Sequence, residues 1–158
     1  MEPNLLAVTI CALIALVEGL CAGRDPMTQL RALRQPRWAP PTVAWILIGV
    51  FWYAICLTAL ARLLPHYQEH PRTVWLLIVL MLANAAANIP QFRLRRLDIA
   101  FFYLFPYWVL LTAFLWRIWH FDRVSTVLFT IYAAYQLYAA AWAWTLWRLN
   151  QPGPTSAA

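Results

Sequence analysis

The sequence contains no lysine, only four glycines and three cysteines, and only six acidic residues among 158. Its charged fraction is 11%, whereas a soluble domain averages about 25%. It has no Gly-rich phosphate-binding loop, nucleophile elbow or zinc motif. These absences argue against a soluble protein and against a nucleotide-binding or hydrolytic enzyme.

The potential metal-binding side chains are few and badly spaced. Cys11, Cys21 and Cys56 lie in apolar stretches without ligand spacing, and we interpret them as small buried side chains. His66 and His70 have the i, i+4 spacing of a helical metal site, but prolines flank the pair and favour an exposed loop. We expect no metal site and no required cofactor.

Apolar residues, in contrast, make up 63% of the chain, and the mean hydropathy is +0.60. A transmembrane helix needs about 20 mainly apolar residues, and barrel-type alternation is not seen. The first stretch has no preceding basic segment and is followed by Arg24, so we interpret it as a retained helix. The prediction is an all-α membrane protein: one five-transmembrane-helix bundle over residues 1–150, with helices at about 5–22, 43–64, 74–92, 99–119 and 124–147, and a disordered tail at 151–158.

All twelve basic residues are arginines, and they divide unequally between the two ends of such a bundle. Because cytoplasmic loops carry the excess of positive charge, we expect the N-terminus outside and the C-terminus in the cytoplasm. The scatter of arginines over several loops argues against nucleic acid as a partner. The lipid bilayer is the partner that we expect. Arginine without lysine suggests a bacterial source. The eight on the predicted cytoplasmic side are Arg24, Arg31, Arg34, Arg37, Arg93, Arg95, Arg96 and Arg148, and the four opposite are Arg62, Arg72, Arg117 and Arg123.

Aromatic residues form 16% of the chain, with ten tryptophans. Tyr135, Tyr138 and Trp142 follow the three-and-four spacing of one helical face. Rings directed into a bundle would make a slot for planar apolar ligands such as tetrapyrroles or sterols. Ordinary helix packing is the alternative interpretation.

The first loop contains the tetrapeptide 38–41, a tryptophan followed closely by paired prolines. Each proline fixes φ and lacks an N–H, so Trp38 has a defined position where the next helix begins. We expect Trp38, Pro40 and Pro41 to form one wall of a pocket and to act as its lid.

Polar side chains inside the predicted spans require partners. Asn84 and Asn88 lie one turn apart, and they serve either helix–helix hydrogen bonding or contact with a ligand. Glu18 is the carboxylate well inside a span, and it is either functional or paired with Arg24. Pro90 is predicted to kink the third helix.

Taken together, these residues resemble the TspO/MBR family, the tryptophan-rich sensory or translocator proteins of the peripheral benzodiazepine receptor type. The likeness covers about residues 5–150. It rests on the P-x-W-x-P-P segment of the first loop and the W-R-L-N end of the fifth helix, and on further matches at Trp45, Tyr53, Asn84 to Phe92, Trp108, Thr112 and Tyr132. The chain departs from the family pattern at Gly49, Ala87, Gln91, Ile131, Tyr135 and Ala143.

The resemblance implies a membrane protein that binds porphyrin, haem or sterol-like ligands in an aromatic pocket. Transport of such ligands, which would require dimerisation, and light-dependent porphyrin degradation are the alternatives. The missing tryptophans at Gly49 and Tyr135 weaken degradation more than binding, and no catalytic residue is assigned. The expected pocket consists of Trp38, Pro40, Pro41, Trp45, Tyr53, Asn84, Tyr132, Tyr135, Ala139 and Ala143, with Arg31, Arg34 or Arg37 meeting ligand carboxylates.

Overall fold

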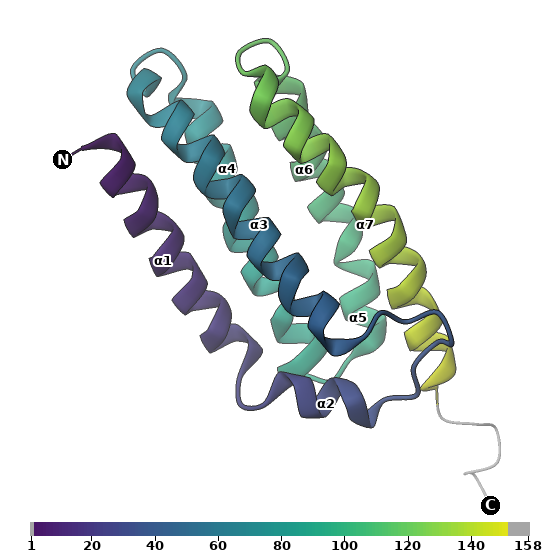
Figure 1. Ribbon diagram of the computed structural model, residues 1–158. Coiled ribbons are helices and arrows are strands. Elements are labelled where there is room, and N and C mark those ends of the chain that lie inside the picture. The colour runs from purple at the N-terminus through teal and green to yellow at the C-terminus, as the bar shows by residue number, and fades with distance from the viewer. Residues whose placement is uncertain (1, 152–158) are drawn as a thin grey trace, which may run out of the picture.

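The computed structural model describes residues 2–151, a range that is mostly helical and contains no strand. Within that range, five helical segments are long and apolar enough to cross a membrane, which confirms the predicted architecture. The start of the first segment and the end of the fifth lie at opposite ends of the bundle (Figure 1), as an odd number of crossings requires. The predicted disorder of the tail falls outside the described residues, except at Gln151. The five segments are Pro3–Ala22, Thr42–His66, Pro71–Arg93, Leu97–Ile118 and Arg123–Leu149.

The long helices pack as a closed ring. Helix α1 (Pro3–Ala22) lies against α3 (Thr42–Leu63) and α4 (Pro71–Ala86). Helix α6 (Leu104–Ile118) packs on α4, and α7 (Arg123–Leu149) closes the ring between α6 and α3. Because α3 also contacts α4, these two helices form the middle of the bundle.

Two of the membrane segments are interrupted at prolines. Helix α4 ends at Ala86, and the chain continues as the π-helix η2 (Ile89–Arg93), which confirms the predicted break at Pro90. The fourth segment is divided into α5 (Leu97–Phe102) and α6, a division that was not predicted. Pro106 has no N–H to offer the carbonyl of Phe102 one turn earlier. The short 3₁₀ helix η1 (Leu64–His66) continues α3.

The first loop contains a short helix, α2 (Pro26–Ala32), that hydropathy did not reveal. Gly23 ends α1 with φ of 76°, a left-handed conformation that glycine adopts without strain. Arg93 then donates a hydrogen bond of 2.6 Å to the carbonyl of Leu20 at this helix end. The chain therefore turns sharply, and α2 lies across the end of the bundle (Figure 1).

The remainder of the first loop is attached to the end of α7 by Asn150. The backbone N–H of Arg34 donates to Asn150 Oδ1 at 2.9 Å, and Asn150 Nδ2 donates back to the carbonyl of Arg34 at 3.0 Å. Asn150 closes the W-R-L-N segment, so the motif at the end of the fifth span holds the loop that follows α2.

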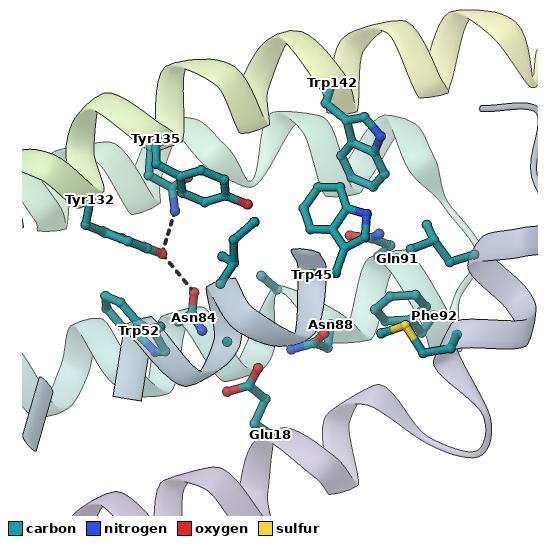
Figure 2. Close-up of a pocket in the computed structure, with 16 residues that line it drawn as sticks. Glu18, Trp45, Trp52, Asn84, Asn88, Gln91, Phe92, Tyr132, Tyr135 and Trp142 are labelled. Carbon is teal, nitrogen blue, oxygen red and sulfur yellow. Dashed lines mark hydrogen bonds between the residues drawn. The ribbon is translucent and has the colours of Figure 1, made fainter. Parts of the chain in front are cut away.

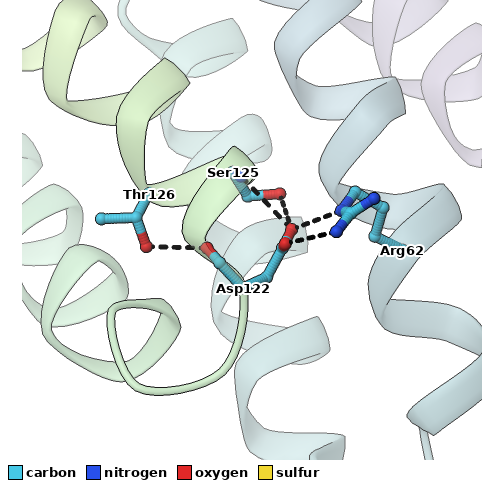
Figure 3. A network of polar contacts seen from close by, with 4 residues as sticks. All are labelled: Arg62, Asp122, Ser125 and Thr126. Atoms are coloured by element: carbon cyan, nitrogen blue, oxygen red, sulfur yellow. Dashed lines mark hydrogen bonds and ion pairs between the residues drawn. The ribbon is translucent and has the colours of Figure 1, made fainter.

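At the opposite end of the bundle, Asp122 joins α3 to α7 (Figure 3). Arg62 on α3 donates to both carboxylate oxygens, at 2.8 and 2.7 Å, and Ser125 donates to the same group from the first turn of α7. Burial by itself raises the pKa of Asp122. The hydrogen bonds from Arg62 and Ser125 lower it by more than burial raises it, so the pKa is about 2. This ion pair fixes the helices at the end remote from α2.

Candidate ligand-binding site

A cavity of about 260 Å³ lies inside the bundle, near its α2 end. It separates the main apolar core, which contains Trp52 and Tyr132, from a smaller cluster built around Leu30, Trp142 and Leu146. Side chains from α1, α2, α3, α4, η2 and α7 surround it (Figure 2). The lining consists of Glu18, Met27, Leu30, Trp45, Ile48, Gly49, Trp52, Asn84, Ala87, Asn88, Gln91, Phe92, Tyr132, Tyr135, Gln136 and Trp142.

Aromatic rings from α3 and α7 form much of the wall. The rings of Trp45 and Trp142 have centroids 4.5 Å apart and are inclined by 51°. Trp52 lies against Tyr132 at 4.5 Å with an angle of 33°, and Tyr135 follows at 6.0 Å from Tyr132. These offset, tilted arrangements are favourable for aromatic pairs. They hold the rings in place around the cavity.

The hydroxyl of Tyr132 is the centre of a buried hydrogen-bond network. It accepts from Gln136 Nε2 one turn along α7 and donates to Asn84 Oδ1 on α4 at 3.3 Å. Tyr107 on α6 lies 3.0 Å away, oxygen to oxygen, and completes the set as a donor. The predicted role of Asn84 in helix–helix bonding and its predicted contact with the pocket thus involve the same side chain.

Two indole N–H groups of the lining are buried without a partner among the described residues. They belong to Trp52, which is 2% exposed, and Trp142, which is 5% exposed. An unpaired buried N–H loses its hydrogen bonds to water without replacement.

Glu18 brings a carboxylate to the same cavity from α1. Its Oε2 accepts a hydrogen bond of 2.5 Å from the hydroxyl of Tyr53 on α3. Gly49 leaves space beside it, since a Cβ at that position would meet no atom within 4 Å. The predicted alternative, an ion pair of Glu18 with Arg24, is not formed among the described residues.

The structure brings four of the predicted pocket residues together around the cavity: Trp45, Asn84, Tyr132 and Tyr135. The others lie elsewhere. Tyr53 holds Glu18, while Ala143 packs in the small cluster with Leu30, and Ala139 is absent from the lining. The arginines that were predicted to meet ligand carboxylates also lie outside the lining; they are Arg31, Arg34 and Arg37.

The expected lid does not touch the cavity either. Trp38 is 46% exposed, and its ring meets the edge of Tyr138 at 5.4 Å on the outside of the bundle. Pro40 and Pro41 are likewise outside the lining. Met27 and Leu30 of α2 occupy the place that was assigned to this segment. A seven-residue helix is too short for a clear periodic signal, so its residues were not predicted.

Other lining residues had a partial signal in the sequence. Gln136 is a polar residue one turn after Tyr132 in an apolar helix, and such a position inside a membrane indicates a required partner. Trp52 and Trp142 lie well inside their spans, away from the positions of interfacial tryptophans. Phe92 lines the cavity from η2, and its direction depends on the break at Pro90.

A second space of about 360 Å³ lies beside the cavity, under α2. It shares Leu30, Gln91 and Phe92 with the first, so these three side chains separate the two spaces. The arginine in its lining is Arg95, which follows η2. A cation therefore lies near the cavity, but beyond this partition.

Comparison with known protein families agrees with this fold and with the loop and helix-end motifs. The model of the TspO/MBR family matches residues 7–148, nearly the whole chain. The chain belongs to the TspO/MBR family. It matches no individual curated protein.

Four of the six departures suggested by the sequence resemblance line the cavity. They come from three membrane segments and are Gly49, Ala87, Gln91 and Tyr135. The other two, Ile131 and Ala143, lie outside the lining.

Proposed function

We propose that this TspO/MBR family membrane protein is a receptor that binds a small, flat, largely apolar molecule inside its helix bundle. The observation that carries the proposal is the cavity itself, with tilted rings of Trp45, Trp52, Tyr135 and Trp142 in its wall. Ligand sites are mostly apolar and aromatic, with a few placed polar groups. The side-chain amides of the lining supply those polar groups here; they belong to Asn84, Asn88, Gln91 and Gln136.

The volume limits the size of the ligand. Sites for drug-sized molecules measure about 300–1,000 Å³, and this cavity holds about 260 Å³. A molecule of two or three fused rings suits that space. A tetrapyrrole, the larger ligand that the family resemblance suggests, needs Leu30, Gln91 and Phe92 to move so that the two spaces join. Its carboxylates would then meet Arg95.

Two glycines provide a matched test. Gly49 lines the cavity, Gly19 lies exposed on α1, and a Cβ at either position would meet nothing within 4 Å. We expect acridine, titrated calorimetrically against purified protein in detergent, to bind wild type and Gly19→Trp with equal affinity. Gly49→Trp should weaken binding by about ten-fold or more, because its indole occupies the ligand space. If Gly49→Trp and Gly19→Trp bound acridine with equal affinity, the cavity would be refuted as the acridine site.

Protoporphyrin titration examines the larger ligand. If the joined spaces accept it, Arg95→Gln should weaken protoporphyrin binding by about 1 kcal/mol or more, because the guanidinium loses a carboxylate partner. Acridine binding should not change in this variant, since Arg95 does not line the smaller cavity. Undiminished protoporphyrin binding would exclude Arg95 as the carboxylate contact.

The orientation follows from the arginine distribution. The segments that carry the eight arginines lie at the α2 end, where α7 also ends (Figure 1). By the excess of positive charge we propose that this end faces the cytoplasm, so the cavity lies nearer the cytoplasmic surface. Reporter fusions at Gln151 would test the orientation. If a reporter that works only outside the cell were active in such a fusion, the proposed orientation would be contradicted.

A further inference from the structure

The charge of the cavity lining is unusual for a protein with a net charge of +6. Among its sixteen residues, Glu18 is the acid, and no arginine or histidine is present. The tyrosine hydroxyls and the amides that complete the polar lining carry no charge at neutral pH. A ligand inside the bundle is therefore next to a carboxylate, while Arg95 lines the neighbouring space and Arg93 donates to the carbonyl of Leu20 outside the lining.

The carboxylate is held in place and still has free capacity. Tyr53 donates to Oε2, and the second oxygen, Oε1, takes no part in that bond. Figure 2 shows the side chain of Glu18 extending from α1 toward the rest of the lining, with Asn84 and Asn88 next to it and Tyr135 and Trp142 on the far side. The bond with Tyr53 orients the carboxylate, and Gly49 in the same lining leaves open space, since a Cβ there would meet nothing within 4 Å.

The remaining wall complements the same kind of charge. Faces of tryptophan and tyrosine rings attract organic cations through their negative quadrupole. Trp45, Trp52, Tyr135 and Trp142 supply such rings around the cavity. Side-chain amides of Asn88 and Gln91 add oxygen atoms that can accept from an N–H donor. A carboxylate, aromatic faces and amide oxygens together favour a protonated nitrogen over an anionic group.

We propose that the cavity selects a flat aromatic amine in its protonated form, with the positive nitrogen against Glu18 and the ring against the aromatic side chains of the wall. The inference rests on the proposed binding function and names the class of ligand. In the low-dielectric interior the attraction between the nitrogen and the carboxylate is stronger than at a surface. A ligand carboxylate in the same position would be repelled by Glu18.

Three acridines with one ring system and different charges provide the test. At neutral pH, 9-aminoacridine is a cation, acridine is neutral and acridine-9-carboxylate is an anion. Calorimetric titration of purified protein should give the tightest binding for the cation and the weakest for the anion. Glu18→Gln keeps an acceptor for Tyr53 and removes the charge. This variant should bind the cation about ten-fold more weakly than the wild type does, and its affinity for neutral acridine should stay within about two-fold of the wild-type value.

Glu69→Gln is the matched control, because it removes the same charge from an exposed carboxylate outside the cavity lining. It should leave all three affinities unchanged. Each ligand is compared with itself across variants, so partition into detergent cancels. If Glu18→Gln does not fold, the order of the three wild-type affinities decides, after each is corrected for the measured partition of that ligand into protein-free detergent.

The results separate the two proposals. Equal binding of cation and neutral acridine by the wild type would overturn the charge inference and leave the receptor function intact. An unchanged preference for the cation in Glu18→Gln would also overturn it, because the selectivity would then arise elsewhere. Binding of none of the three would refute both.

Discussion

Removal of the Tyr132 hydroxyl, which is the centre of the buried network, should destabilise the bundle more than removal of the neighbouring Tyr107 hydroxyl. Tyr132→Phe keeps the ring against Trp52 but withdraws the acceptor for Gln136 and Tyr107. Tyr107 and Gln136 are 3% and 7% exposed, so water cannot easily replace the lost bonds. Asn84 and Gln136 both line the cavity, but Asn84 is the more exposed of the two, so water can replace its bond of 3.3 Å more easily.

The magnitude follows from the number of groups left without a partner. An unsatisfied buried donor costs about 1–3 kcal/mol in soluble proteins, and hydrogen bonds measured inside membranes average about 0.6 kcal/mol. Two stranded donors therefore place the loss for Tyr132→Phe at about 2 kcal/mol. Tyr107→Phe removes one donor and strands none, so its loss should be about 0.5–1 kcal/mol.

The double variant distinguishes a network from two independent bonds. With both hydroxyls gone, the stranded donor of Tyr107 no longer exists, and the loss should be no larger than that of Tyr132→Phe alone. Reversible unfolding in mixed detergent micelles, followed by far-UV circular dichroism, measures all three free energies. Strictly additive losses would refute the coupling, and a loss for Tyr107→Phe equal to that for Tyr132→Phe would refute the central role of Tyr132.

Three further predictions concern residues away from the cavity. Trp38→Ala should change acridine affinity by less than about two-fold in calorimetry, because the indole packs on Tyr138 outside the lining; a larger loss would return Trp38 to the site. Asp122 has a folded pKa of about 2, below the unfolded value of about 3.9, so its stabilisation is present above about pH 4 and disappears as the pH falls toward about 2. Wild type should therefore exceed Asp122→Asn by about 2 kcal/mol in unfolding free energy at neutral pH, with the difference vanishing in acid, and a constant difference would contradict this reasoning. Asn150→Ala should cost about 1–2 kcal/mol and speed proteolysis of the first loop, since both hydrogen bonds to Arg34 are lost; unchanged cleavage would show that other contacts hold the loop.

The membrane architecture could be predicted because it depends on quantities that are local in the chain. Helix length and hydropathy follow from the thickness of the bilayer, and the break at Pro90 follows from the missing N–H. The loop and helix-end motifs indicated the family that the match over residues 7–148 shows. Trp45, Asn84, Tyr132 and Tyr135 were also predicted as pocket residues, and all four line the cavity.

Which side chains share a space was decided by tertiary structure. The break before Pro90 sets where Phe92 and Gln91 lie, and the Asn150 bonds draw the first loop toward α7, away from the cavity. Helix α2, too short for a periodic signal, then covers the end that Trp38 was expected to close. Periodicity defines a face of one helix, but the contents of a cavity depend on the rotation and break points of several helices at once.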